Sequence, residues 1–325
     1  MDITSEQRAP GGSSASIRVL RLGTRGSALA TRQTQLVAEL LAARHPGLAC
    51  EATIIASLGD QVTDKPLSQL GAQGIFTQAL ERALFEGTVD AAVHSAKDLP
   101  STVADGMVLA AFPVRENPLD CLVSRDGLTL DLLPKGATIG TGSPRRATQL
   151  VAARPDIHMM SIRGNVDTRR RAALNGTVDA VILAAAGLSR LGLLDEHAVP
   201  LSIDVCLPQA GQGALAIEAR STDLEVIELL RAIDDPRTRA CVEAERAVLA
   251  GLAAGCQAPV AAFAEIMGDN QVRLRAIVST DPEHAIRAEE VGPIDLAAHL
   301  GYMVARRLDA LGAGELLRAA KSGQF

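Results

Sequence analysis

Residues 92–100 have the sequence AVHSAKDLP, and the rest of the chain is organised around them. An apolar run ends there in ionisable and hydroxyl side chains, and Pro100 prevents a helix from continuing. We interpret the run as a buried strand, because open α/β sheets bind ligands beyond the carboxyl ends of their strands. Lys97 and Asp98 would then emerge where a small molecule can meet them. The alternative is a solvated turn, which adjacent Lys and Asp residues at a strand end also form.

The composition indicates a globular protein with aliphatic cores. Of the 325 residues, 47% are hydrophobic and only 2% are aromatic, so the cores must consist mainly of Ala, Leu, Val and Ile. The net charge of -6 gives the whole molecule no attraction for nucleic acid or an anionic membrane, and neither is expected as a partner. Any site for an anion must therefore be a local cluster of cations.

Features that report on location favour the cytoplasm. Residues 1–16 are polar, lack the apolar core of a signal peptide and are expected to form a disordered tail. The longest uncharged apolar run, residues 180–188, is too short to span a bilayer. The five cysteines are scattered without a CxxC pair, which is typical of free thiols in a reducing compartment.

Alternating strands and helices predict an α/β fold with two lobes whose sheets are rich in parallel strands. In the first lobe, strands at residues 17–22 and 50–56 and the strand before Lys97 alternate with two helices, the second at residues 75–85. The pattern recurs over residues 137–184. A strand at residues 215–218 would return to the first sheet. From residue 222 onward, two helical regions flank alternating strands at residues 260–279 and indicate a separate α+β domain.

The expected domain organisation follows from these elements. It consists of the tail at residues 1–16, a first α/β domain at residues 17–114 and 212–232, a second at residues 115–211, and a smaller α+β domain at residues 233–325. The two segments that cross between the two α/β lobes, residues 115–118 and the glycine-rich residues 207–214 (LPQAGQGA), would form a hinge.

Cations follow several predicted strand ends. Arg25 lies in GTRGS at residues 23–27, where Ser27 is a candidate helix N-cap. In GTGSPRR at residues 140–146, Ser143 suits the N-cap, so two arginines fall in the first helical turn. Cations are unfavourable there unless an anion binds. The candidate cluster comprises Arg25, Lys97, Arg145, Arg146, Arg163, Arg169 and Arg190, with the carboxylate of Asp98.

Such a cleft would bind a ligand with several anionic groups, because arginine pairs bidentately with carboxylate or phosphate. The sequence has no GxxxxGK[ST] phosphate loop, and no HExxH or paired-cysteine pattern supports a metal site. An ionised Asp98 among these cations would suit the stabilisation of positive charge that develops on a substrate.

Four motifs in this order closely resemble the hydroxymethylbilane synthase, or porphobilinogen deaminase, family. They are VHSAKDLP at residues 93–100, GTGSPRR at 140–146, RGNVDTR at 163–169 and GCQAP at 255–259. The resemblance implies a cytoplasmic, monomeric, three-domain enzyme of tetrapyrrole synthesis, whose two α/β lobes resemble those of periplasmic binding proteins. Such an enzyme joins four porphobilinogen molecules head to tail, releases ammonia at each step, and then releases linear hydroxymethylbilane by hydrolysis.

The resemblance also implies a cofactor and roles for individual residues. The cysteine at the position of Cys256 carries a covalent dipyrromethane through a thioether, and the chain grows from it. Asp98, Lys97 and Arg25 match catalytic positions. Cofactor-binding positions are Cys256, Ser95, Lys97, Asp98, Ser143, Arg145, Arg146, Arg163, Arg169 and Arg190. Substrate-binding positions are Arg25, Ser27, Arg163, Arg169 and Gln212. Each porphobilinogen carries an acetate and a propionate, which agrees with the expected arginine-lined cleft.

Some positions depart from the family pattern. Gln69, Gln73, Gln78 and Ser189 stand where many members have lysine, so the cleft has lost positive charge, particularly around the loop at residues 60–74. Ala254 replaces a glycine usual before Gly255, which would stiffen the cofactor loop.

Two other functions remain open on the residues alone. A non-catalytic two-lobed protein could bind a polycarboxylate, but this leaves Cys256 without a role. A hydrolase using Cys256 and His94 would leave the arginines unexplained. His94 itself, opposite Ser95 on an alternating strand, is expected to be a hydrogen-bonded core residue.

Overall fold

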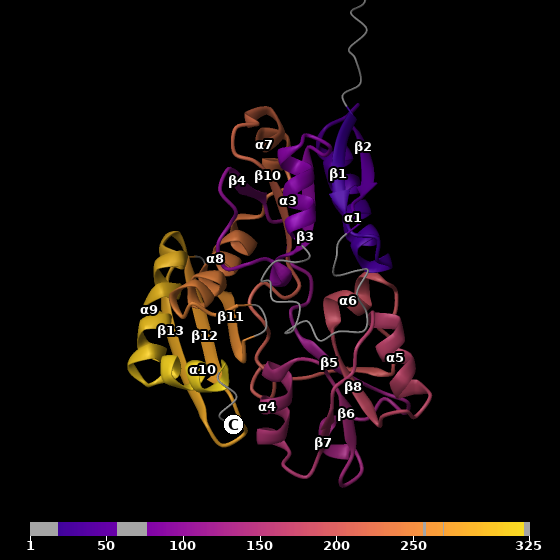
Figure 1. The fold of residues 1–325 in the computed structure, drawn as a ribbon, viewed down its shortest axis with the longest axis vertical. Coiled ribbons are helices and arrows are strands. Elements are labelled where there is room, and N and C mark those ends of the chain that lie inside the picture. The colour runs from indigo at the N-terminus through magenta and orange to yellow at the C-terminus, as the bar shows by residue number, and fades with distance from the viewer. Residues whose placement is uncertain (1–18, 57–76, 256–257, 269, 322–325) are drawn as a thin grey trace, which may run out of the picture.

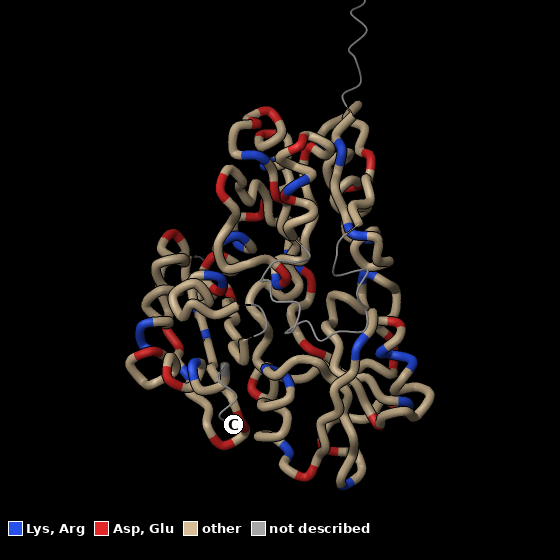
Figure 2. The backbone as a smooth tube through the Cα atoms, in the orientation of Figure 1, with Lys and Arg blue, Asp and Glu red and all other residues tan. Residues whose placement is uncertain are grey.

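The computed structural model describes residues 19–56, 77–255, 258–268 and 270–321, which form three parts, each built on one sheet (Figure 1). The expected tail at residues 1–16 and the loop at residues 60–74 lie outside the described residues. None of the described helices is both long and apolar enough to cross a membrane. Lys and Arg are interspersed with Asp and Glu along the backbone of all three parts (Figure 2).

The first part is a five-stranded sheet with the order β2-β1-β3-β10-β4. Its strands are β1 (Val19–Thr24), β2 (Ala49–Ile54), β3 (Ala91–Ser95), β4 (Met107–Ala111) and β10 (Leu215–Arg220). Its helices are α1 (Ala28–Arg44), α3 (Gln78–Phe85) and α7 (Leu224–Arg231). Buried aliphatic residues of β1, β3 and β10 pack against α1 and α7, which gives this part its own core.

The second part repeats this plan with the order β7-β6-β8-β5-β9. Its strands are β5 (Asp120–Ser124), β6 (Thr138–Gly140), β7 (His158–Met160), β8 (Ala180–Ala184) and β9 (Ala198–Pro200). Its helices are α4 (Pro144–Ala153), α5 (Val166–Leu174) and α6 (Ala185–Arg190). Two separate clusters of buried aliphatic side chains lie in this part.

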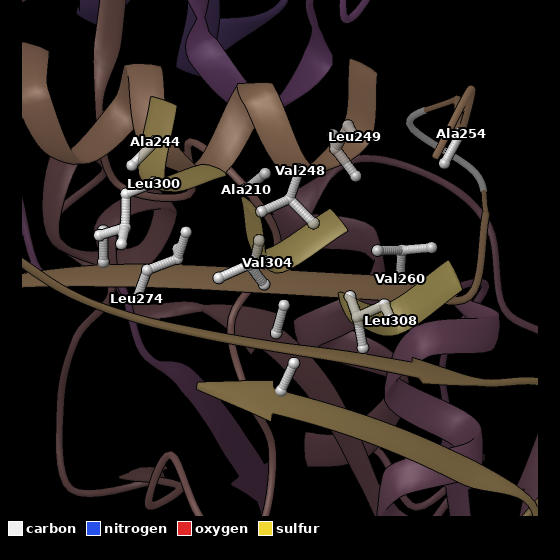
Figure 3. Close-up of a cluster of buried hydrophobic side chains, with 14 of the residues drawn as sticks. Ala210, Ala244, Val248, Leu249, Ala254, Val260, Leu274, Leu300, Val304 and Leu308 are labelled. Atoms are coloured by element: carbon white, nitrogen blue, oxygen red, sulfur yellow. The ribbon is translucent and has the colours of Figure 1, made fainter. Parts of the chain in front are cut away.

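The third part is an antiparallel sheet covered by helices. It comprises β11 (Val260–Met267), β12 (Gln271–Ser279), β13 (Ala285–Pro293), α8 (Pro236–Gly251), α9 (Ala297–Ala310) and α10 (Ala313–Lys321). Figure 3 shows its core, in which Val248 of α8 and Val304 of α9 meet Leu274 of β12. The expected α+β character is confirmed, although β13 was not predicted.

Both larger sheets are rich in parallel strands, as expected, and each is mixed because it contains one strand, β10 or β5, that runs antiparallel to its neighbours. β10 begins beside the end of β3, with Leu215 opposite Ser95, and runs antiparallel to it. In the same way β5 begins with Asp120 opposite Ala184 at the end of β8. Each of these strands follows a segment that crosses between the two parts at the carboxyl edge of the parallel strands. A strand that starts at this edge must run antiparallel. The predicted return of the chain to the first sheet is confirmed, and the residue-level domain boundaries stay a prediction.

The three parts meet at a buried carboxylate. Glu245 of α8 is fully buried, and its oxygens accept hydrogen bonds from Arg115 Nη1 at 2.7 Å, Gly211 N at 2.6 Å and Ala264 N at 2.8 Å. Arg115 lies in the first crossing segment, and its Nε donates to Gln212 O in the second at 2.8 Å. One side chain of the third part therefore fixes both crossing segments.

Candidate active site

A cavity of about 290 Å³ lies between the first and second parts. The first part supplies residues of α1, β3 and the turn after β3, and the second supplies residues of α4, α5, β8 and α6. Its charged lining in the described chain consists of Lys97, Asp98, Arg146, Arg169 and Arg190. Cations that follow four different strands, β3, β6, β7 and β8, thus converge on one cavity with the carboxylate of Asp98.

The end of β3 forms one wall of this cavity. After Ser95 the chain makes one turn of 3-10 helix over Ala96–Asp98, which brings Lys97 and Asp98 to the cavity. Asp98 is exposed, whereas Ser95 is half-buried and its Oγ accepts a hydrogen bond from Gln33 Nε2 at 2.8 Å. Gln33 also lines the cavity and was not predicted from the sequence.

The second crossing segment holds this turn from behind. Gln209 Nε2 donates to Lys97 O at 3.1 Å, and Ala96 N donates to Ala214 O at 3.0 Å. Gly211 has a φ of +73°, and a Cβ there would lie 2.9 Å from Lys97 N. A glycine is required at this position because both the backbone conformation and the close approach exclude a side chain.

Burial changes the protonation equilibrium of Lys97. Its Nζ donates to Gln212 Oε1 at 3.4 Å. Burial, followed by the neighbouring charge of Arg146, lowers the pKa of Lys97 from 10.5 to about 8, while the charges of Asp98 and Asp120 act in the opposite direction. The ammonium group of Lys97 is therefore in equilibrium with the neutral amine near physiological pH.

Two arginines of the second part are desolvated at the cavity. Burial lowers the pKa of Arg169 to about 10, with a further contribution from Arg146. The same cause lowers the pKa of Arg190 to about 10, and the carboxylate of Glu116 partly offsets it. Arg190 Nη2 donates to Gly213 O at 2.7 Å, which links α6 to the second crossing segment. Both groups stay cationic at neutral pH and would gain from an anionic ligand.

The anion at the start of α4 belongs to the protein itself. Arg145 and Arg146 are both buried, and both pair with Asp120, at 2.7 Å and 2.6 Å. Burial would raise the pKa of Asp120, but the charges of both arginines outweigh it and hold that pKa far below its usual range. The inference that these arginines require an external anion is thus corrected. Of the two, Arg146 lines the cavity in the described chain.

Other predicted site residues have different surroundings. Ser27 caps α1, with its Oγ accepting from Ala30 N at 3.2 Å. Gln212 is fully buried behind the lining, and Ser143 lines the cavity. Arg25 and Arg163 are not among the described lining residues. Cys256, Gln69 and Gln73 lie outside the described residues.

The structure also describes two of the positions at which many family members have lysine, and the histidine of the hydrolase hypothesis. Gln78 is the exposed first residue of α3, and Ser189 Oγ donates to Glu116 Oε2 at 3.3 Å. His94 is buried, with Nε2 3.1 Å from Glu218 Oε2, so its expected core role is confirmed. This placement counts against the hydrolase hypothesis, because His94 is not among the described residues of the cavity.

The remaining wall of the cavity is apolar. It is formed by Leu29, Val166, Leu183, Ala184, Ala186, Gly187 and Ala214. Leu29 comes from the first part and Gly187 from the second, and a Cβ on Gly187 would lie 3.7 Å from Leu29 Cδ2. A flat ring with carboxylate substituents suits such a cavity, because the wall can pack against the ring while the cations bind the substituents.

The fold and cavity define a two-lobed α/β protein with a cavity lined by cations between its lobes. Comparisons with known proteins specify the class further. Residues 20–228 match the family described as "Porphobilinogen deaminase, dipyromethane cofactor binding domain", and residues 239–310 match "Porphobilinogen deaminase, C-terminal domain". The chain belongs to the porphobilinogen deaminase family. It is an enzyme of tetrapyrrole synthesis, as its motifs predicted, and the description of the first match confirms the dipyrromethane cofactor at the level of the family.

Relatives match over nearly their whole length. The porphobilinogen deaminase of Thermobifida fusca is 46% identical over 313 residues, which cover 94% of this chain and 97% of the relative. That of Desulforudis audaxviator is 44% identical over 306 residues, with 94% and 99% covered. A solved structure of a putative methionine-binding lipoprotein from Bacillus subtilis is 13% identical, with a TM-score of 0.41 over 68% of this chain and 92% of its own.

Proposed function

We propose that the cavity between the first two parts is where porphobilinogen units are joined head to tail with loss of ammonia, before linear hydroxymethylbilane is released by hydrolysis. The observation that carries this proposal is the convergence of Asp98 with the cations Lys97, Arg146, Arg169 and Arg190 on one cavity. A non-catalytic polycarboxylate-binding protein would need the cations but not the carboxylate.

The lining fits a dipyrromethane. The four cations match the carboxylate substituents of two pyrrole rings, and the apolar wall that includes Leu183 and Ala186 can pack against the rings. When bound, the group supplies the free pyrrole carbon to which the first substrate unit is joined. We propose Cys256 as the attachment point. The support is its motif GCQAP and the described flanks, where Ala258 N donates to Gly255 O at 3.0 Å.

Asp98 is proposed as the catalytic carboxylate. When the C–N bond of the substrate breaks and ammonia leaves, positive charge develops on the pyrrole, and an ionised carboxylate beside the ring stabilises it. After the new C–C bond forms, the ring carbon must lose a proton, and in this proposal the same carboxylate accepts it. The turn over Ala96–Asp98, held by Gln209, fixes where this carboxylate lies.

The cations are proposed to bind and orient the substituents. Arg169 and Arg190 are desolvated on the α5 and α6 side, and Lys97 faces them from the first part. Carboxylates bound between the two sides would hold the lobes together around the reacting atoms. Arg25 and Ser27 stay proposals for binding the incoming substrate, on the strength of their motif and their place at the start of α1.

The test replaces Asp98 by Asn and measures ammonia release and hydroxymethylbilane formation from porphobilinogen. We expect kcat to fall by about 10²-fold or more in Asp98→Asn, because the base and the stabilising charge are both lost. Asp98→Glu keeps the carboxylate and should lose less activity. The matched control is Asp105→Asn, the same substitution at an exposed turn outside the cavity. Porphobilinogen that binds without turnover in the native chain would instead favour the non-catalytic binding protein.

We further propose a monomeric, cytoplasmic enzyme. The described cysteines Cys50, Cys121, Cys206 and Cys241 are free thiols, which supports a reducing compartment. Sedimentation of the purified chain at several concentrations tests the monomer, and a concentration-dependent increase in mass would contradict it.

A further inference from the structure

Asp120 is a fully buried carboxylate at the first position of β5, and the mechanism above does not use it. Oδ2 accepts a hydrogen bond from Arg145 Nη2 at 2.7 Å. Oδ1 accepts from Arg146 Nη2 at 2.6 Å, from Arg146 Nε at 3.1 Å and from Gln212 Nε2 at 2.9 Å. Its two oxygens therefore bind donors from α4 and from the second crossing segment together.

These contacts extend to the lining of the cavity. Gln212 Nε2 also donates to Pro118 O at 2.7 Å, which fixes the amide so that its Oε1 faces Lys97 Nζ at 3.4 Å and Arg146 Nη2 at 3.5 Å. Lys97 and Arg146 both line the cavity. Asp120 thus contacts one lining cation, Arg146, directly and a second, Lys97, through Gln212.

We propose that Asp120 is a positioning residue of the active site: it orients Arg146 directly and Lys97 through Gln212, and it offsets the positive charge that Arg145 and Arg146 place behind the cavity. The proposal rests on the proposed function only in taking Lys97 and Arg146 as ligand-binding groups. Arg145 is assigned a supporting role, because its Nη1 donates to Leu207 O and its Nη2 to Asp120.

The proposal has a consequence for the proton on Lys97. The charged groups around its ammonium are Asp98 beside it, Arg145 and Arg146 from α4, and Asp120 from β5. Removing the charge of Asp120 leaves the two arginines uncompensated and makes the ammonium less favourable. The pKa of Lys97 should then fall below its value of about 8 in the native chain. A general loosening of the fold would expose Lys97 to water and raise its pKa instead.

The experiment measures the reactivity of Lys97 toward trace acetic anhydride as a function of pH, by mass spectrometry of the digested protein. Only the neutral amine reacts, so a decrease of half a pKa unit raises the rate at pH 7 about threefold. We expect such an increase for Asp120→Asn, with the exposed Lys135 in the same digest as the internal reference. Intact masses are recorded so that only samples with the same covalent modification are compared.

A double variant separates charge from packing. Asp120→Asn combined with Arg145→Gln removes one charge of each sign, and the Lys97 rate should return toward the native value. A Lys97 rate that is unchanged or lowered in Asp120→Asn would overturn the proposal, as would a double variant no closer to the native rate. Because labelling needs no turnover, these outcomes are independent of whether the chain makes hydroxymethylbilane.

Discussion

Lys97 is a cavity residue whose charge changes within the neutral to mildly alkaline pH range. It is protonated below its pKa of about 8 and neutral above it. If its ammonium binds a substrate carboxylate, kcat/KM for porphobilinogen should decrease as the pH rises through 8, by up to about tenfold for the loss of one charged hydrogen bond. Lys97→Arg stays cationic over this range and should lack that decrease. Steady-state kinetics from pH 6.5 to 9 provide the check, and an unchanged profile in Lys97→Arg would assign the decrease to another group.

Ser27 has a capping role at the scale of the element. Its Oγ accepts from Ala30 N at 3.2 Å, so Ser27→Ala should destabilise the protein by about 1 kcal/mol, whereas Ser27→Thr keeps the acceptor. Urea unfolding measures this loss. The KM for porphobilinogen, measured on the same variants, tests the second role proposed for Ser27. A KM unchanged in Ser27→Ala would restrict the residue to capping.

Gly213 in the second crossing segment is required both by its backbone conformation and by a close backbone contact, and comparison with Gly87, which has only the first constraint, separates the two effects. Gly213 has a φ of +88°, and a Cβ there would lie 2.3 Å from Glu116 O. Gly87 has a φ of +69°, with no heavy atom within 4 Å of such a Cβ. We expect Gly87→Ala to cost about 1 kcal/mol for the backbone conformation alone. Gly213→Ala should cost roughly 3 kcal/mol or more, because the neighbouring backbone must also move. If thermal unfolding showed the same loss of stability in both variants, the backbone around Glu116 would accommodate the added Cβ at little cost.

For the whole molecule, the junction at Glu245 should control how the three parts unfold together. Glu245→Gln leaves Arg115 buried without a charged partner and should lower the free energy of unfolding by about 3 kcal/mol. Glu228→Gln removes an exposed pair with Arg231 and should change it by less than about 0.5 kcal/mol. Urea titrations followed by circular dichroism compare the two. If Glu245→Gln had the same free energy of unfolding as the control, the junction would contribute nothing to stability.

Much of the arrangement could be predicted because strand ends leave a local pattern. The apolar run before Lys97 became β3, and the repeated turns with arginine marked the edge at which the two lobes meet. The parallel direction of most strands followed from their alternation with helices, whereas the reversed direction of β5 and β10 could not be predicted, because an apolar run is the same in either direction. β13 was missed since only Ala288 and Gly292 are buried among its nine residues, which leaves no apolar run to detect.

The groups behind the cavity were missed for a different reason. Asp120 is separated by 25 and 26 residues from the arginines it pairs with, and nothing in its own stretch DCLVS indicates an internal anion. Gln33 donates to Ser95 and Gln209 donates to Lys97 O, both far away in the sequence, so neither glutamine carries a local signal. Spacing located the charged groups that line the cavity, whereas the groups that hold them became evident only from the tertiary structure.

The most direct test of the central claim is the intact mass of the native chain beside Cys256→Ala, after both have been incubated with porphobilinogen. An acidic aldehyde test for pyrroles accompanies each sample. We expect the native chain to carry a mass excess of two pyrrole units together with pyrrole colour, and the variant to carry neither. A native chain that stays unmodified after incubation would contradict the account, and a variant that gains the same mass would place the attachment on another residue.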